Sequence, residues 1–169
     1  MTGYPGAYRK GTNMNRPALC FIAILLLLAG CGPTPEMRHA QDRQAEQESI
    51  RTQLSTADSL STFDAVWDRA FRSRYLTEAL VQEIQQARAD WYVRTHADLL
   101  PIVRDAIQQH RLLVGMTAEQ VHASWGKPRM ANPSLVDVGG THEQWIYQGR
   151  TCVYLDNAVL SAWQGEGHY

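Results

Sequence analysis

The chain has 169 residues, of which 44% are hydrophobic and 20% are charged. This is the composition of an ordinary globular protein, and the length gives room for one folded domain with attached segments. The 16 basic and 17 acidic residues nearly balance. Because no basic stripe is present, we expect no nucleic-acid partner.

The first thirty residues have the pattern of an export signal. Arg9, Lys10 and Arg16 precede Ala18–Ala29, a run without any polar side chain. This run is too short to span a bilayer and has the length of the apolar region of a signal peptide. Residues 28–31 read Leu-Ala-Gly-Cys, which resembles the lipobox of bacterial lipoproteins.

That resemblance implies a signal peptide over residues 1–30, cut before Cys31. Cys31 would then carry a diacylglycerol on its sulfur and an acyl chain such as palmitate on its amine, which together anchor a protein durably. Gly32 follows the cysteine where an aspartate would favour retention, so we expect an outer-membrane protein that faces the periplasm. A cytosolic protein with an apolar N-terminal helix, or an uncleaved signal anchor, is the alternative. The start lies at Met1 or at Met14, because residues 14–16 would themselves form a compact basic region.

Removal of the signal changes the cysteine content and the charge. Cys20 would leave with the signal and Cys31 would be lipidated, so Cys152 would have no partner for an internal disulfide. Cys152 lies in an alternating apolar run, where we expect a small buried side chain; a reactive or partner-linking thiol is the alternative. The mature chain would keep 13 of the 16 basic residues against 17 acidic ones, a formal net charge of about −4.

The segment 31–60 is expected to be a tether, flexible or partly helical from Met37, because up to about Ser49 it has almost no large apolar side chain. Helices are predicted across 61–111. The first shows an apolar stripe at helical spacing and a cap at Ser61 with Asp64, the second follows from Thr77, and the third is opened by Pro101. The residues predicted to face inward are Phe63, Val66, Trp67, Ala70, Phe71, Leu80, Val81, Ile84, Ala87, Trp91, Ile102, Val103, Ala106 and Ile107.

A short capped helix is predicted within Val114–Pro128. Gly115 permits a turn, Thr117 with Gln120 forms a capping box, and Gly126 ends the helix before Pro128 prevents its resumption. Val121 and Trp125 lie four residues apart on one face, so this helix must pack against another element.

A loop is predicted over Arg129–Gly140. After it, apolar residues recur at every second position, as they do in β-strands. His142–Gln148, Thr151–Leu155 and Ala158–Gln164 alternate as strands, with a tight turn at Asp156-Asn157. These strands form an antiparallel three-stranded meander, which needs a helix across one face to be stable. The fold class is therefore α+β, with the short helix as the cover.

This C-terminal pattern resembles the SmpA/OmlA (BamE-like) family of bacterial lipoproteins, and more closely its uncharacterised members. The resemblance covers Val114–Gln164 and implies a module at 112–169 of helix packed on a three-stranded antiparallel sheet. It also implies a role in outer-membrane protein assembly. The motifs in order are Gly115-Met116-Thr117, Glu119-Gln120-Val121, Gly126-Lys127-Pro128, Gln144-Trp145-Ile146-Tyr147 and Val159-Leu160. The residues that define the module structurally are Gly115, Met116, Thr117, Val121, Trp125, Gly126, Pro128, Trp145 and Tyr147.

No motif for catalysis or cofactor binding is present, so we expect a protein that is not an enzyme and has no cofactor and no small-molecule substrate. The histidines have no metal-ligand spacing, and His122 with Glu119 is interpreted as a surface helix contact. The candidate partner-binding residues are Trp145, Tyr154 and Trp163, because outward aromatic side chains are common at interfaces. We expect the protein to bind another envelope protein and to support envelope or outer-membrane protein assembly. A periplasmic binding or inhibitory module, with 61–111 as its partner surface, is the alternative; an envelope hydrolase has the least support.

Overall fold

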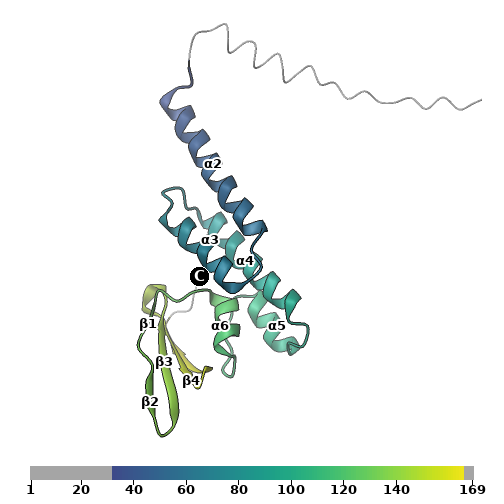
Figure 1. Ribbon diagram of the computed structural model, residues 1–169, viewed down its shortest axis with the longest axis vertical. Coiled ribbons are helices and arrows are strands. Elements are labelled where there is room, and N and C mark those ends of the chain that lie inside the picture. The colour runs from purple at the N-terminus through teal and green to yellow at the C-terminus, as the bar shows by residue number, and fades with distance from the viewer. Residues whose placement is uncertain (1–31, 166–169) are drawn as a thin grey trace, which may run out of the picture. The chain divides into compact units, whose positions relative to one another are not determined.

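The computed structural model describes residues 32–165 (Figure 1). The chain divides into two compact units, Met1–Gln41 and Asp42–Tyr169. Helix α2 (Pro35–Ser55) begins in the first unit and ends in the second. The expected signal peptide and Cys31 lie outside the described residues. The features below belong to the second unit.

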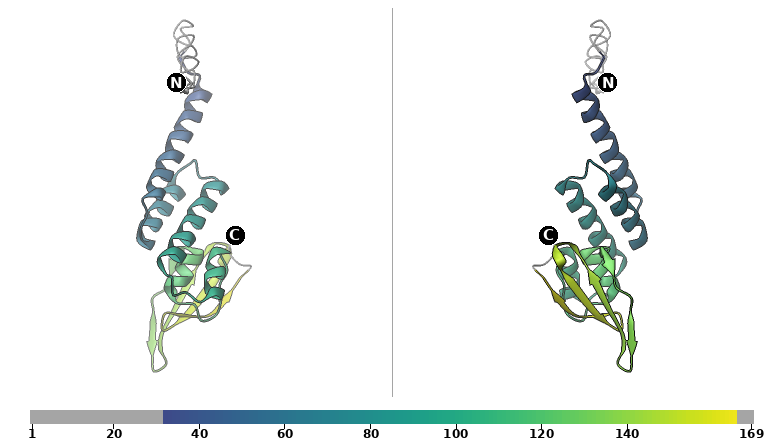
Figure 2. Two further views of the ribbon diagram at one scale, coloured as in Figure 1. Left: turned by 90° about the vertical axis from the view of Figure 1, so that its right-hand side faces the viewer. Right: turned by 90° about the vertical axis from the view of Figure 1, so that its left-hand side faces the viewer.

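Four further helices precede the sheet, and the three views agree that α3 and α4 lie side by side (Figures 1 and 2). The helices are α3 (Leu60–Arg72), α4 (Glu78–Thr95), α5 (Pro101–Gln108) and α6 (Ala118–Trp125). The sheet strands are β1 (Met130–Ala131), β2 (Leu135–Asp137), β3 (Gly140–Ile146), β4 (Cys152–Asp156) and β5 (Val159–Gln164), with a 3₁₀ turn η1 (Gln148–Arg150) between β3 and β4. The fold is α+β, as the sequence predicts.

The sheet contains the predicted meander and two additional short strands. Strands β3, β4 and β5 pair antiparallel in chain order, while β1 and β2 both pair with the other edge of β3. The stretch predicted as a loop over Arg129–Gly140 therefore includes two strands. All five strand residues there are exposed, so burial imposes no alternating pattern that could reveal them.

Strand β3 also differs from its predicted bounds. It begins at Gly140, directly after the two-residue turn Val138-Gly139, and it ends at Ile146. The turn between β4 and β5 lies at Asn157-Ala158, one residue later than predicted. Both residues have positive φ, 51° and 62°, as a type I′ hairpin turn requires.

Two clusters of buried side chains hold the unit together. The smaller joins α2, α3 and α4 through Ile50, Val66, Ala70, Leu80 and Ile84. The larger joins α4, α5, α6 and the sheet, and its fully buried members include Ala89, Ile107, Val121, Val153 and Leu155. Helix α6 thus packs against residues of the meander within the larger cluster.

The two clusters show that the folded unit has different boundaries from those predicted from the sequence. Ile50, expected in the tether, has no exposed surface, and the compact unit begins at Asp42. The helical segment 61–111 and the module 112–169 share the larger cluster. They are parts of one unit because neither α4 nor α6 can bury its apolar face without the other.

Three details of the predicted helices need correction. Helix α3 is capped by Ser59, two residues before the expected Ser61, because Ser59 and Thr62 form a reciprocal capping box. Phe71 and Ile102 were predicted to face inward and are 58% and 64% exposed. Both lie at an end of their helix, where no neighbouring element covers the apolar stripe.

Candidate functional site

Helix α6 is positioned by caps at both ends. Its N-terminus has the predicted capping box, in which Thr117 accepts from the Gln120 amide and Gln120 accepts from the Thr117 amide. Its C-terminus stops at Gly126, which has φ of 80° and so adopts a conformation that favours glycine. Val121 and Trp125 are buried, 0% and 5% exposed.

The last carbonyls of α6 accept hydrogen bonds from two other parts of the chain. The final four carbonyls of a helix have no partner within it. Here Arg88 Nε of α4 donates to Ala123 O at 3.1 Å, and Arg88 Nη2 approaches Ser124 O at 3.4 Å. His110 Nδ1 also lies 3.1 Å from Ser124 O. The end of α6 is therefore the point where α4 and the segment after α5 are tied to the module.

Arg88 is a buried cation. Its side chain is 2% exposed, and burial lowers its pKa to about 10, so it remains protonated at neutral pH. No carboxylate within residues 32–165 forms an ion pair with it. The negative end of the α6 dipole and the Asp64 carboxylate, which acts through space, both favour its charged form.

Two further groups complete this junction. Tyr147 leaves the end of β3, is 3% exposed, and donates its hydroxyl to Gly126 O at 3.0 Å; burial raises its pKa. Burial also lowers the pKa of His110, so this ring is neutral at neutral pH and must carry its proton on Nδ1 to donate to Ser124 O. Trp125 packs edge-on against Tyr147 at 5.3 Å between ring centroids.

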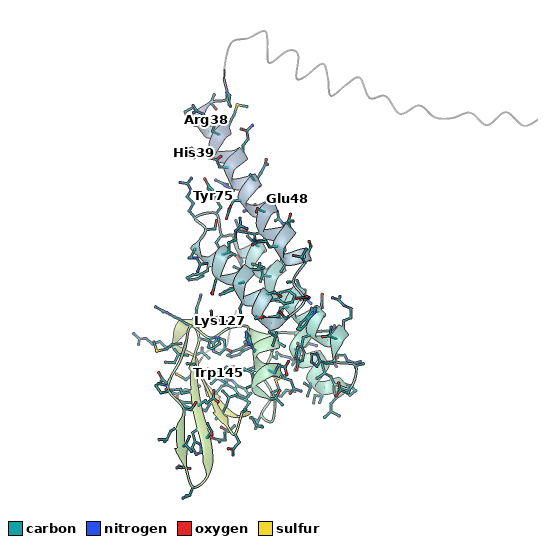
Figure 3. The ribbon with its side chains drawn as sticks, viewed as in Figure 1. Arg38, His39, Glu48, Tyr75, Lys127 and Trp145 are labelled. Carbon is teal, nitrogen blue, oxygen red and sulfur yellow. The ribbon has the colours of Figure 1, made fainter. Side chains whose placement is uncertain are left out.

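A cleft of about 680 Å³ opens beside this junction. Side chains of α3, α4 and the segment from Trp125 to Arg129 line it. Those used below are Trp67, Asp68, Phe71, Arg88, Lys127 and Arg129. Figure 3 labels Lys127 where α3 meets the segment that leads into β1. Lys127 Nζ lies 3.0 Å from Asp68 Oδ2, in a pair whose side chains are 46% and 39% exposed.

The cleft has an apolar wall on α3. The rings of Trp67 and Phe71 stack at 6.4 Å and 23°, and Phe71 is more than half exposed. The rest of the lining includes the cations Arg88, Lys127 and Arg129 and the acid Asp68. The arrangement suits binding of a ligand that is partly apolar and partly anionic. It provides no nucleophile with an adjacent base, so it supplies no evident chemistry.

The residues predicted to bind a partner do not form one surface. Trp145 (Figure 3) and Trp163 both neighbour Val153 across the ladder, whereas Tyr154 lies between Gln144 and Ala162. Directly paired residues share a face and successive residues alternate, so Tyr154 lies on the face opposite the two tryptophans. Trp145 is half-buried against the larger cluster, and Trp163 is 41% exposed.

The residues predicted to define the module lie at turns, in the larger cluster or beside the cleft. Gly115 has φ of 94° and its amide donates to Leu160 O at 2.8 Å. Met116 is 1% exposed in the larger cluster. Pro128 borders the cleft. Of the predicted set, only Trp125, Gly126, Pro128 and Tyr147 line the cleft.

The sequence reasoning missed Arg88 and the role of Trp67 and Phe71. Arg88 follows Ile84 by four residues and precedes Tyr92 by four, and both neighbours are buried. A charged residue within an apolar stripe was the available signal. Its hydrogen-bond acceptors lie 35 and 36 residues later, which no local pattern reveals.

Other polar contacts differ from the sequence interpretation. His122 pairs with Asp64 of α3 at 2.8 Å rather than with Glu119. His142 lies opposite Asp156 and Cys152 lies opposite Ile146. Cys152 is half-buried. Within the described residues, no group of His, Cys, Asp and Glu is arranged to hold a metal ion.

His142 lies between two carboxylates at the base of the β2–β3 hairpin. Its Nδ1 is 2.7 Å from Asp156 and its Nε2 is 3.2 Å from Asp137. Hydrogen bonds to Asp156 and Asp137 raise the pKa of His142 above 6.5. Bonds from the Gly139 amide and from His142 lower the pKa of Asp137 below 3.8, and bonds from His142 and Ser161 do so for Asp156.

We therefore expect the stability of the β2–β3 hairpin to be constant over a range of pH and to fall at both higher and lower pH. The histidine contribution is complete below pH 6.5 and is lost as pH rises through the raised pKa; the aspartate contributions are complete above pH 3.8 and are lost as pH falls through the lowered pKa values. The protection of the β2 and β3 amides, taken as the intrinsic exchange rate at each pH divided by the observed rate, should be greatest between these limits. Asp156→Asn should lower the His142 pKa in an NMR titration, and an unchanged pKa would contradict the bridge.

No family model, curated protein or solved structure matches this chain. Within residues 32–165, no helix is both long enough and apolar enough to cross a membrane.

Proposed function

We propose that this protein is a lipid-anchored envelope protein whose folded unit binds another envelope protein through the cleft beside α6. The observation that carries the binding role is the stack of the half-buried Trp67 ring and the exposed Phe71 ring on one wall of that cleft. Exposed aromatic side chains beside positive charge are typical of protein-binding sites. The lipobox-like sequence ending at Cys31 supports the anchor and the outer membrane as its location.

The resemblance to the SmpA/OmlA family supports a role in outer-membrane protein assembly or maintenance. The cleft supports a second candidate, a periplasmic binding or inhibitory module unrelated to barrel assembly. Trp67, Phe71 and Arg88 come from the helices at 61–111, outside the part of the chain that carries the resemblance. The partner's identity decides between these candidates.

Affinity capture from detergent-solubilised envelopes tests the binding role. A Phe71→Glu variant should lose the captured partner, because it places a charge on the apolar wall of the cleft. Leu135→Glu is the matched control, since Leu135 is 64% exposed on β2 and does not line the cleft. Recovery of barrel-assembly subunits supports the assembly role; recovery of other envelope proteins supports the second candidate. Equal capture by both variants contradicts the assignment of the cleft.

The anchor gives a separate prediction. Cys31→Ser removes the sulfur that would carry the lipid, so the protein should move from the membrane fraction to the soluble periplasmic fraction. Fractionation followed by immunoblotting measures this. Cys152→Ser is the control and should stay with the membrane. Retention of Cys31→Ser in the membrane would contradict lipidation at this residue.

A further inference from the structure

The charge of the cleft is opposite to that of the mature chain. Three cations, Arg88, Lys127 and Arg129, line it together with one acid, Asp68. The chain after Cys31 carries an excess of acidic residues. A positively charged cleft attracts negatively charged ligands, even on a domain whose net charge is negative.

The positive charge in the cleft is only partly compensated. Arg88 is buried without an ion pair to any described carboxylate. Its charge is offset in part by the Asp64 carboxylate, which acts on it through space, and by a helix C-terminus, which supplies roughly half an elementary charge. Lys127 is paired with Asp68, but this pair is exposed on both sides. Exposed pairs of this kind contribute little to stability, so an incoming carboxylate can replace Asp68 at low cost.

The apolar wall adds a second requirement. The stacked rings of Trp67 and Phe71 lie beside this charge. Trp67 is half-buried and Phe71 is exposed, so neither ring is fully buried. An aromatic or branched aliphatic side chain would remove this surface from water. The cleft therefore favours a ligand in which an apolar group lies next to a carboxylate.

We propose that the cleft binds an acidic segment of the partner protein, with an apolar side chain on Trp67 and Phe71 and a neighbouring carboxylate against Lys127 and Arg129. This inference rests on the proposed function and specifies the chemistry of the partner. An acidic peptide carries both groups within neighbouring residues. A phospholipid headgroup alone would place polar groups on the two rings, so it fits the apolar wall less well.

The test uses the mature chain with Cys31→Ser and the peptide acetyl-Glu-Phe-Glu-amide. Addition of the peptide should shift the NMR signal of the Trp67 indole N–H. The affinity measured in this titration should fall as salt is added. Acetyl-Gln-Phe-Gln-amide lacks the charge and acetyl-Glu-Ala-Glu-amide lacks the ring. Each should bind about tenfold more weakly, which corresponds to about 1.4 kcal/mol.

Matched variants separate the cleft from the general charge of the surface. Arg129→Gln should weaken binding of acetyl-Glu-Phe-Glu-amide about fivefold, roughly the loss of one exposed charge contact of 1 kcal/mol. Arg94→Gln removes the same charge from an exposed position of α4 that does not line the cleft. It should change the affinity less than twofold. Equal effects of the two variants would overturn the proposal.

Lipid is tested with vesicles of phosphatidylcholine and phosphatidylserine in equal parts. If the vesicles shift the Trp67 signal and the peptide does not, the ligand is a lipid and the proposal is wrong. If neither shifts it while Phe71→Glu still abolishes capture from envelopes, the cleft binds a protein of different chemistry and only this inference fails. If capture also survives Phe71→Glu, the proposed function fails with it.

Discussion

Replacing Gly126 with alanine is expected to lower the free energy of unfolding by about 3–5 kcal/mol, which is a large share of the stability of a typical domain. Two effects contribute. Gly126 has φ of 80°, which strains any residue with a Cβ. A Cβ at this position would also lie 2.5 Å from Arg88 Nη1, which is fixed by the α6 carbonyls and cannot move freely.

Gly115→Ala separates these two effects. Gly115 has φ of 94°, but nothing lies within 4 Å of a Cβ built there. It should therefore show only the conformational cost, about 1–2 kcal/mol. Urea unfolding of both variants measures the difference. If the two glycines cost the same, the close approach of Arg88 to Gly126 contributes nothing and the packing described here is wrong.

Replacing Arg88 with methionine is expected to cost about 2–4 kcal/mol. The variant leaves Ala123 O without its described donor and removes one of two donors to Ser124 O. A buried carbonyl that loses its partner costs about 1–3 kcal/mol. Methionine carries no charge, so the variant no longer has to bury an unpaired cation. This gain offsets part of the loss and keeps the expected cost below a larger value.

Arg94→Met is the matched control on the same helix. Arg94 is exposed, so this variant should change the unfolding midpoint little. A double variant of Gly126→Ala with Arg88→Met then measures the contact between the two sites. Its cost should be less than the sum of the single costs, because the shorter methionine removes the clash with the new Cβ. Additive costs would show that Arg88 and Gly126 do not interact.

Much of the fold could be predicted because its signals are local. The capping box of Thr117 and Gln120 lies within four residues and both bonds form. The cap at Thr77 and Pro101 at the start of α5 are equally local. Strand β4 shows alternation because Val153 and Leu155 are buried in the larger cluster and the residues between and beside them are not fully buried.

The candidate site could not be predicted because it depends on burial and on contacts distant in sequence. Helical spacing placed Trp67 and Phe71 on an apolar stripe, but spacing does not tell how far a neighbouring helix covers that stripe. Arg88 is held by carbonyls of a different helix. The sequence predicts Trp145, Tyr154 and Trp163 as partner-binding residues because they are aromatic, and only the strand register shows that they occupy two faces of the sheet.

Photo-crosslinking in intact cells tests the central claim most directly. A benzophenone side chain at position 71 replaces an exposed aromatic ring with a larger one and leaves the buried clusters unchanged. The same group at position 135 is the control, because Phe71 and Leu135 are similarly exposed, 58% and 64%, and only Phe71 lines the cleft. We predict a covalent adduct with an envelope protein from position 71 and little from position 135. Equal adducts from the two positions, or none from position 71, would contradict a partner-binding cleft.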